Sequence, residues 1–189
     1  TALPILFRSG ILRMFYPKSK IIQRIDPMIH STQTRDKFSG LYETFNSFDL
    51  RLLFLRNSSI LAGYRYATEV FLDEKFNTSI ARMIASSQLT KQFFFSLSYY
   101  YGKKIRYVAN PYQGSGSDAS ATMTYLPSEK LHLDLSLIYS DFYRDSDSSK
   151  EFDYTIIRSR NTYQMNKYLF FRCIVEYNSF HKQLMTDFL

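Results

Sequence analysis

A strict alternation of apolar and polar side chains marks the segment 131–140. Leucine or tyrosine occupies every odd position, and the even positions are mostly polar, with His132, Asp134 and Ser136 among them. Successive side chains of an extended strand point to opposite faces, so this period of two predicts a β-strand with one apolar and one mostly polar face. The chain must therefore fold so that the two faces of this strand meet different surroundings.

Three further segments repeat the pattern, at 60–72, 93–101 (extended to 92–107) and 169–178. Weaker versions lie at 5–16, 21–30, 41–56, 78–89, 117–126 and 152–163, with another beginning at Leu184. Many exceed the roughly 5 to 6 residues usual in globular sheets and approach the roughly 9 to 11 that cross a bilayer. Together they predict an all-β chain of about eleven antiparallel strands.

The residue composition also favours strands. The chain has 17 Phe and 16 Tyr but only 6 Gly and 5 Pro, and aromatic residues are enriched in β-structure. It lacks the long apolar run of a membrane helix, and its mean hydropathy is -0.26. Membrane strands also give a low mean hydropathy, because only alternate residues face lipid. The net charge of +7 is scattered along the chain, which does not favour a nucleic-acid partner.

Short and long connections are expected to alternate along the chain. The short ones are 17–20, 57–58, 89–91, 127–129 and 165–167, and the longer polar ones include 31–40, 73–77, 108–116 and 145–150. Short turns at one rim and longer loops at the other are typical of bacterial membrane barrels. Tyrosines near the predicted strand ends would form two interfacial girdles. They are Tyr16, Tyr42, Tyr107, Tyr125, Tyr139, Tyr143, Tyr163, Tyr168 and Tyr177.

Charged residues fall on the face opposite the apolar stripe. They are Arg51, Arg65, Glu69, Asp134, Arg158, Arg160, Arg172 and Glu176. A Lys or Arg facing lipid at the bilayer midplane costs roughly 2 to 4 kcal/mol, so these side chains are predicted to line a wet or ion-paired interior. On the last complete hairpin, Glu176 should lie opposite or diagonal to Arg158. We expect Asp134 or Asp153 to supply a further carboxylate.

No catalytic residue, metal site or cofactor is assigned from the sequence. His30, His132 and His181 lack metal-ligand spacing. A hydrolase pair of His132 with Ser136 or Ser140 is less favoured than lumen lining, because these residues share one strand. The other weak candidates are read structurally: Cys173 as a small hydrophobe, the acidic run Asp141, Asp145, Asp147 and Glu151 as a solvated loop, and Gly114-Ser115-Gly116 as a loop tip.

Several short motifs occur in a characteristic order. They are Tyr16-Pro17, Asn57-Ser58-Ser59, Glu69 followed by Phe76, Leu126-Pro127-Ser128, and the stretch 166–179 with its Leu-Phe-aliphatic strand and Tyr-Asn-Ser end. From about Phe7 onward this order resembles the C-terminal barrel domain, of unknown function, that follows a carbohydrate-binding-family-9-like domain in large secreted outer-membrane proteins. Cys173 and Glu176 depart from that family's pattern without disturbing the alternation. The resemblance implies a missing N-terminal module, which could bind carbohydrate, and further strands on both sides.

The expectation is therefore an antiparallel up-and-down transmembrane β-barrel, of which residues 1–189 are one segment truncated at both ends. It would lie in the outer membrane of a Gram-negative cell, contact lipid, and act as a membrane anchor or porin-like pore for an extracytoplasmic module. Two alternatives stay open. One is a barrel-embedded hydrolase, and the other is a soluble lipocalin-like β-barrel binding protein with its apolar face turned inward.

Overall fold

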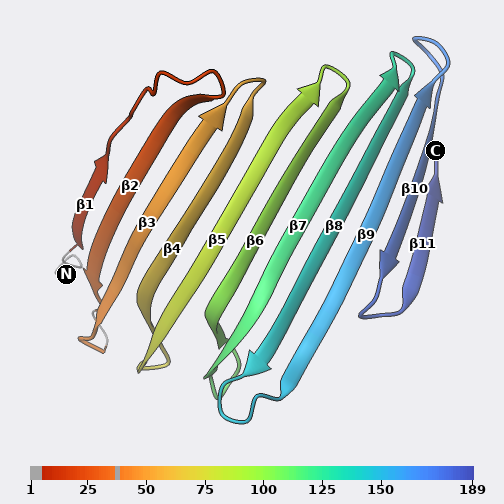
Figure 1. Ribbon diagram of the computed structural model, residues 1–189. Coiled ribbons are helices and arrows are strands. Elements are labelled where there is room, and N and C mark those ends of the chain that lie inside the picture. The colour runs from red at the N-terminus through yellow and green to blue at the C-terminus, as the bar shows by residue number, and fades with distance from the viewer. Residues whose placement is uncertain (1–5, 37–38) are drawn as a thin grey trace.

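The computed structural model describes residues 6–36 and 39–189, which form eleven strands (Figure 1). The strands are β1 (Leu6–Leu12), β2 (Ile22–Arg35), β3 (Tyr42–Phe54), β4 (Ser58–Phe71), β5 (Glu74–Thr90), β6 (Phe93–Arg106), β7 (Tyr112–Ser128), β8 (Leu131–Arg144), β9 (Lys150–Gln164), β10 (Phe170–Asn178) and β11 (Gln183–Phe188). Ile5, Lys37 and Phe38 of the predicted strand and loop segments lie outside the described residues. The prediction of an all-β chain with about eleven strands is confirmed.

All strands belong to one antiparallel sheet whose spatial order is the chain order, β1 to β11. Each strand pairs with the next through a hairpin, which confirms the up-and-down arrangement. The sheet is open, because β1 and β11 form its two edges and do not pair with each other among the described residues. Within the described ranges, no helix is long and apolar enough to cross a membrane.

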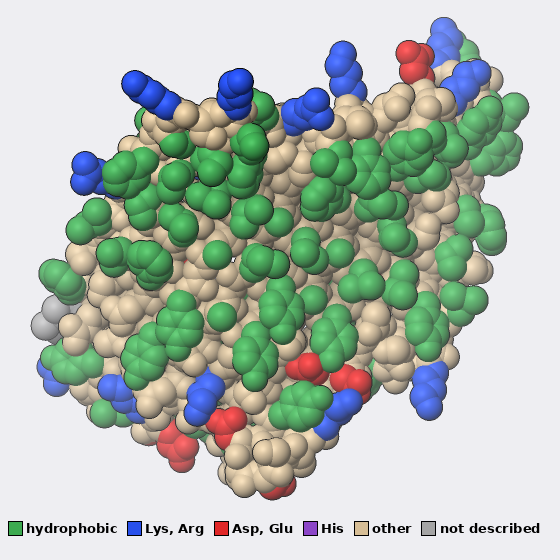
Figure 2. All heavy atoms as spheres, viewed as in Figure 1, with side chains coloured by type: hydrophobic (Ala, Val, Ile, Leu, Met, Phe, Trp, Pro, Cys, Tyr) green, Lys and Arg blue, Asp and Glu red, His purple; other side chains and the backbone are tan. Residues whose placement is uncertain are grey.

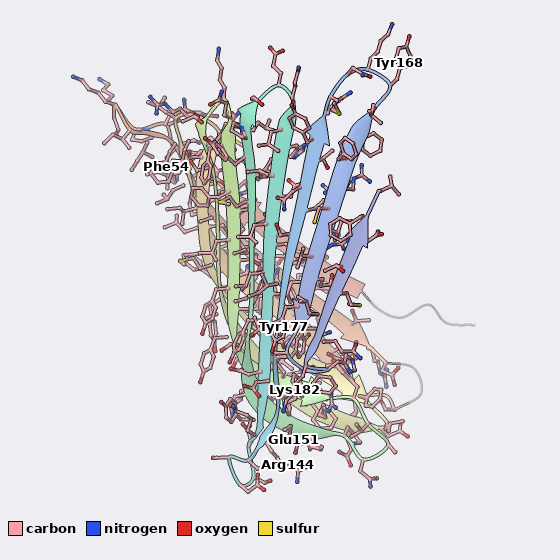
Figure 3. The ribbon with its side chains drawn as sticks, turned by 90° about the vertical axis from the view of Figure 1, so that its right-hand side faces the viewer. Phe54, Arg144, Glu151, Tyr168, Tyr177 and Lys182 are labelled. Atoms are coloured by element: carbon pink, nitrogen blue, oxygen red, sulfur yellow. The ribbon has the colours of Figure 1, made fainter. Side chains whose placement is uncertain are left out.

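Paired residues of neighbouring strands share one face of the sheet, so the register divides the side chains into two sets. What we call the polar face carries the odd-numbered residues of β3, β4 and β11 and, apart from bulges, the even-numbered residues of the other strands. The apolar face carries the opposite set. Figure 2 shows a broad hydrophobic band on the apolar face, with charged side chains gathered along two borders. Seen from the side, the sheet curves so that this face is convex (Figure 3).

The sheet has almost no hydrophobic core of its own. Within the described part of the chain, the buried hydrophobic residues are Phe76, Ile105 and Phe142. Large side chains in the middle of the apolar face stay exposed, such as Phe48 at 55% and Leu135 at 40%. The accessible surface of 13177 Å² exceeds by about two fifths the roughly 9,400 Å² expected of a folded monomer of this mass. The hydrophobic effect within this sheet alone therefore leaves much apolar surface uncovered.

The connections form two rims. The upper rim in Figure 1 consists of 13–21, 55–57, 91–92, 129–130 and 165–169, and the lower rim of 36–41, 72–73, 107–111, 145–149 and 179–182. The predicted strict alternation of short and long connections is wrong at three places. The connection predicted as the short turn 165–167 spans 165–169, as long as the lower-rim connections 107–111 and 145–149. The segment predicted as the loop 73–77 is a two-residue turn, in which Leu72 and Asp73 adopt positive φ angles of 51° and 62°, as a tight hairpin of primed type requires. The β1–β2 connection is longer than 17–20, because β1 ends at Leu12 and only Phe15 pairs again, with Ile25.

The segment Gly114-Ser115-Gly116 was predicted as a loop tip and lies instead inside β7, paired with β6 and β8. A Cβ at Gly114 would overlap the Tyr143 carbonyl and the Phe142 ring, and one at Gly116 would overlap the Asp141 carbonyl. The two glycines therefore permit a close approach between β7 and β8 that a side chain would prevent. Their role is packing within the sheet and not turn formation.

Candidate functional site

All eight charged residues predicted to share one face lie on the polar face. The structure does not gather them into one cluster: Arg51, Arg65 and Glu69 lie on β3 and β4, and the other five lie on β8, β9 and β10. Three strands separate the two groups. The polar face is therefore a candidate lining with several local charge networks and not one compact site.

Asp134 is the centre of the network on β8 and β9. Its Oδ2 accepts hydrogen bonds from Arg160 Nη2 at 2.6 Å and Nε at 3.0 Å. Its Oδ1 accepts one from Thr124 at 2.8 Å and lies 3.0 Å from His132 Nε2. The expectation that a carboxylate from a neighbouring strand would meet these arginines is thus confirmed for Asp134. The other candidate, Asp153, lies on the apolar face and pairs with Lys150 at 3.1 Å.

Glu176 lies directly opposite Arg158, as predicted, with 3.8 Å between the charged atoms. A hollow of about 350 Å³ lies beside Arg158, which is half-exposed. On the polar face its lining residues are Thr122, Thr124, Asp134, Ser136, Arg158 and Arg160. The Arg158 guanidinium and the hydroxyl groups of Thr122 and Ser136 line this hollow and can donate hydrogen bonds to a small anionic or hydroxyl-bearing solute.

A second network crosses β4 at its middle. Arg82 on β5 donates from Nε to Asp49 Oδ1 at 2.8 Å and places Nη2 2.6 Å from Oδ2. Both side chains are largely buried, and Gly63 of β4 lies between them in the register. A Cβ on Gly63 would overlap the Asp49 carboxylate. Glycine at this position therefore lets two charges on non-adjacent strands meet across the strand between them.

Further pairs extend the charged lining. Lys104 lies 2.6 Å from Asp118, which also accepts a hydrogen bond from Ser140 at 2.6 Å. Arg24 lies 2.8 Å from Asp26, which is 2% exposed. These residues and the Asp49–Arg82 pair were missed in the sequence. The alternation within each strand could have identified them, because residues two positions apart lie on the same face. Asp49, for example, shares its face with Arg51.

Small hydroxyl side chains fill much of the polar face between the charges. Ser59 bonds Ser86 at 3.1 Å, and Ser98 bonds Ser120 at 2.7 Å. Ser96, Thr122 and Ser136 continue the row of Ser59 and Ser86 across β6, β7 and β8. Such a surface is hydrophilic but carries few large side chains, so it suits contact with water better than dry packing.

Glu69 takes part in a contact at the lower rim. Its Oε1 accepts a hydrogen bond from the Tyr107 hydroxyl at 2.8 Å, and the Tyr107 ring packs edge-on against Phe71 with 5.2 Å between centroids. Burial, and then the hydrogen bond to Glu69, raise the pKa of Tyr107 to about 12. This contact ties the β6–β7 connection to β4. In the next lower-rim connection, hydrogen bonds from Ser149 lower the pKa of Asp147.

The weaker candidates have structural partners. His132 contacts Asp134, and no described hydroxyl group donates to it as a nucleophile would. The acidic residues of 141–151 do not converge: Asp141 accepts from Tyr139, Asp145 faces Lys103, and Glu151 pairs with Arg144 at the lower rim (Figure 3). No group of three or more metal-ligand side chains occurs within residues 6–36 and 39–189. Cys173 is half-buried on the apolar face.

Comparison with protein-family models, with curated proteins and with solved structures gives no match to this chain.

Proposed function

We propose that the chain forms part of the wall of a β-barrel in the outer membrane of a Gram-negative cell, with the apolar face against lipid and the polar face toward the interior. The observation that carries this proposal is the continuous band of exposed hydrophobic side chains across the convex face, bordered by charged rims (Figure 2). Uncovered apolar surface of this extent is unfavourable in water and favourable in hydrocarbon.

The height of the band supports the proposal. On β8 the apolar face runs from Leu131 to Asp141, where the first carboxylate of this strand on that face occurs. Ten residues extend about 34 Å along a strand. A strand tilted by about 45° gains about 24 Å in height over that length, close to the roughly 25 Å apolar band of membrane barrels.

Tyrosines border the band on both sides. Tyr66, Tyr101, Tyr139 and Tyr177 lie on the apolar face in the strand halves that lead to the lower rim, and Tyr125 and Tyr163 lie toward the upper rim. Their rings can lie in hydrocarbon while their hydroxyl groups meet headgroups and water. We therefore propose that these residues form the two interfacial girdles.

Within this proposal the barrel acts as a membrane anchor or as a pore for small solutes. The proposal that a carbohydrate-binding module is attached to this barrel rests on the motif resemblance alone. The soluble lipocalin-like alternative needs the apolar face to turn inward, and the exposure of Leu135 and Phe171 on the convex face argues against that arrangement. The hydrolase alternative needs a nucleophile beside His132, where the nearest bonded group is a carboxylate.

The test is incorporation of the purified full chain into phosphatidylcholine vesicles, followed by extraction with urea and alkaline carbonate. We expect the chain to stay with the vesicles, and Leu97→Asp to reduce incorporation at least tenfold. Ser96→Asp is the matched control, because Ser96 is the neighbour of Leu97 on the polar face. A chain that stays monodisperse in buffer without vesicles or detergent would contradict the proposal.

A further inference from the structure

The two rims carry opposite balances of charge in their connections. The upper connections contain one acidic residue, Glu129, and seven basic ones: Arg13, Lys18, Lys20, Arg56, Lys91, Lys130 and Lys167. The lower connections contain four acidic residues, Asp36, Asp73, Asp145 and Asp147, against Lys37 and Lys182. Figure 2 shows the same difference, since Lys and Arg dominate the upper border of the hydrophobic band and both signs mix at the lower border.

The basic residues of the upper rim have no acidic partners among the residues that the structure describes. All seven are exposed, and none forms an ion pair with another described residue. Near the lower rim, cations are neutralised in the pairs Lys103–Asp145, Arg144–Glu151 and Lys150–Asp153. The positive charge of the upper rim is therefore free to attract an external anion. Near the lower rim Lys75, Arg106 and Lys182 are also exposed and form no ion pair with another described residue, but acidic residues of the lower connections offset their charge.

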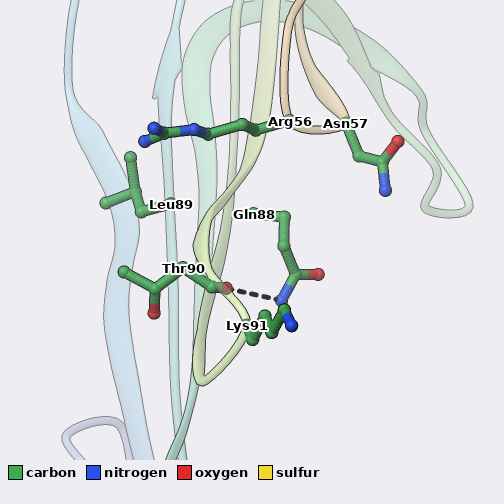
Figure 4. Close-up of a pocket in the computed structure, with 6 residues that line it drawn as sticks. All are labelled: Arg56, Asn57, Gln88, Leu89, Thr90 and Lys91. Atoms are coloured by element: carbon green, nitrogen blue, oxygen red, sulfur yellow. Dashed lines mark hydrogen bonds between the residues drawn. The ribbon is translucent and has the colours of Figure 1, made fainter.

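A hollow of about 630 Å³ lies within the upper rim, between the β3–β4 and β5–β6 turns (Figure 4). It is lined by Arg56, Asn57, Gln88, Leu89, Thr90 and Lys91. Gln88 donates to the Thr90 carbonyl at 2.9 Å, which fixes the turn that carries Lys91. Arg56 and Lys91 extend in different directions from the two turns (Figure 4). Each offers a separate cation near the half-exposed Leu89 at the edge of the apolar band, as lipids with an anionic head and an apolar tail require.

We infer that the upper rim binds the phosphate groups of anionic phospholipids, with Arg56 and Lys91 as two of the contacting cations. The inference rests on the proposed function, since it requires the apolar band to lie in a bilayer. Each Lys or Arg near an anionic membrane surface strengthens association by roughly fivefold. The attraction weakens as salt rises, because it falls off within a Debye length.

The experiment compares phosphatidylglycerol with phosphatidylcholine on the full chain in zwitterionic detergent, with bound lipids counted by native mass spectrometry. We expect phosphatidylglycerol to bind at least roughly 25-fold more tightly than phosphatidylcholine, and the double variant R56Q/K91Q to bind phosphatidylglycerol roughly 25-fold more weakly than the unmodified chain. The matched control, K103Q/K182Q, removes the same charge near the lower rim and should leave the affinity for phosphatidylglycerol unchanged. Near-native circular dichroism of both variants shows that the sheet is intact.

Equal binding of the two lipids would overturn the inference, and so would equal losses in the two double variants. Failure of the proposed function is recognised separately, because incorporation into pure phosphatidylcholine vesicles needs no anionic headgroup. If the chain enters those vesicles but shows no lipid preference, the proposed function is supported and the binding of anionic lipid is contradicted. If the chain enters no vesicles, both are contradicted.

Discussion

The side chains on the two faces of the sheet differ in whether they find partners within the chain. On the polar face, buried carboxylates have partners within the sheet: Asp49 meets Arg82, and Asp26 meets Arg24. On the apolar face, large side chains such as Phe48 and Leu135 remain exposed. The chain therefore pairs these buried carboxylates internally, although the buried Nε atoms of Arg65 and Arg172 have no hydrogen-bond partner among the described residues. It leaves its apolar side chains to be covered by its surroundings. That division is the reverse of a soluble sheet, where apolar side chains find partners inside and charges meet water.

Breaking the Asp49–Arg82 pair is expected to give the largest effect. Arg82→Gln leaves the Asp49 carboxylate, which is 5% exposed, without its guanidinium partner, and should lower the free energy of unfolding by about 3 to 5 kcal/mol. Gly63→Ala should cost a similar amount, because the added Cβ displaces Asp49. Urea titration of the full chain in vesicles measures both. If both substitutions act by breaking the Asp49–Arg82 pair, the Gly63→Ala/Arg82→Gln double variant should lower the free energy of unfolding by no more than about the loss in one single variant.

The half-exposed Arg158 is the control for this pair, since Arg158→Gln removes a charge from the same face. Equal losses in Arg82→Gln and Arg158→Gln would show that the polar face is uniformly solvated, and the contrast between enclosed charges and an exposed apolar face would fail.

A charge on the apolar face should have the next largest effect. Leu135→Arg is expected to destabilise the chain in a bilayer by about 2 to 4 kcal/mol, the cost of a lipid-facing Arg near the midplane. Ser96→Arg, on the polar face of β6 opposite Ser86 and Thr122, should cost less than about 1 kcal/mol. The two variants are compared by urea titration in phosphatidylcholine vesicles. Equal costs would mean that both faces meet the same medium.

Removing Glu176 should give a smaller loss. Glu176→Gln leaves Arg158 without its cross-strand partner, and the separation of 3.8 Å with a half-exposed Arg158 limits the cost to about 1 kcal/mol. Asp147→Asn in a lower-rim loop should shift the unfolding midpoint less, because Asp147 bonds only within its own turn. Equal, small shifts in detergent would contradict a paired network on the last hairpin.

The smallest effect concerns pH at the lower rim. Partial burial, and then the hydrogen bond to Glu69, raise the pKa of Tyr107 from 10.0 to about 12 in the folded chain, so the protonated Tyr107 hydroxyl stabilises the fold fully below pH 10. That contribution is lost as pH rises from 10 to about 12, and solvent exposure keeps it below about 1 kcal/mol. Tyr107→Phe should remove this part of the pH dependence. An unchanged slope of stability against pH above 10 in Tyr107→Phe would disprove the assignment.

The strands were predictable because their alternation is a local property of the sequence. β8 begins at Leu131 as expected, and the face of every predicted charged residue follows from its parity. The Asp49–Arg82 pair was not predictable, since it depends on the registers of two neighbouring hairpins and on a glycine between them. The turn at Leu72 and Asp73 was missed for a different reason: Leu seldom adopts a positive φ, so nothing local marks the turn.

Tryptophan fluorescence tests most directly whether the apolar face contacts lipid, and the chain contains no Trp to interfere. Leu135→Trp and Ser136→Trp place one probe on each face of β8, in the full chain reconstituted with bromine-labelled phospholipids. The account predicts strong quenching of Leu135→Trp by the labelled acyl chains and quenching of Ser136→Trp only by acrylamide in the water. The account would be contradicted if the labelled lipids quenched neither probe and Leu135→Trp were also protected from acrylamide, because the apolar face would then be covered by protein.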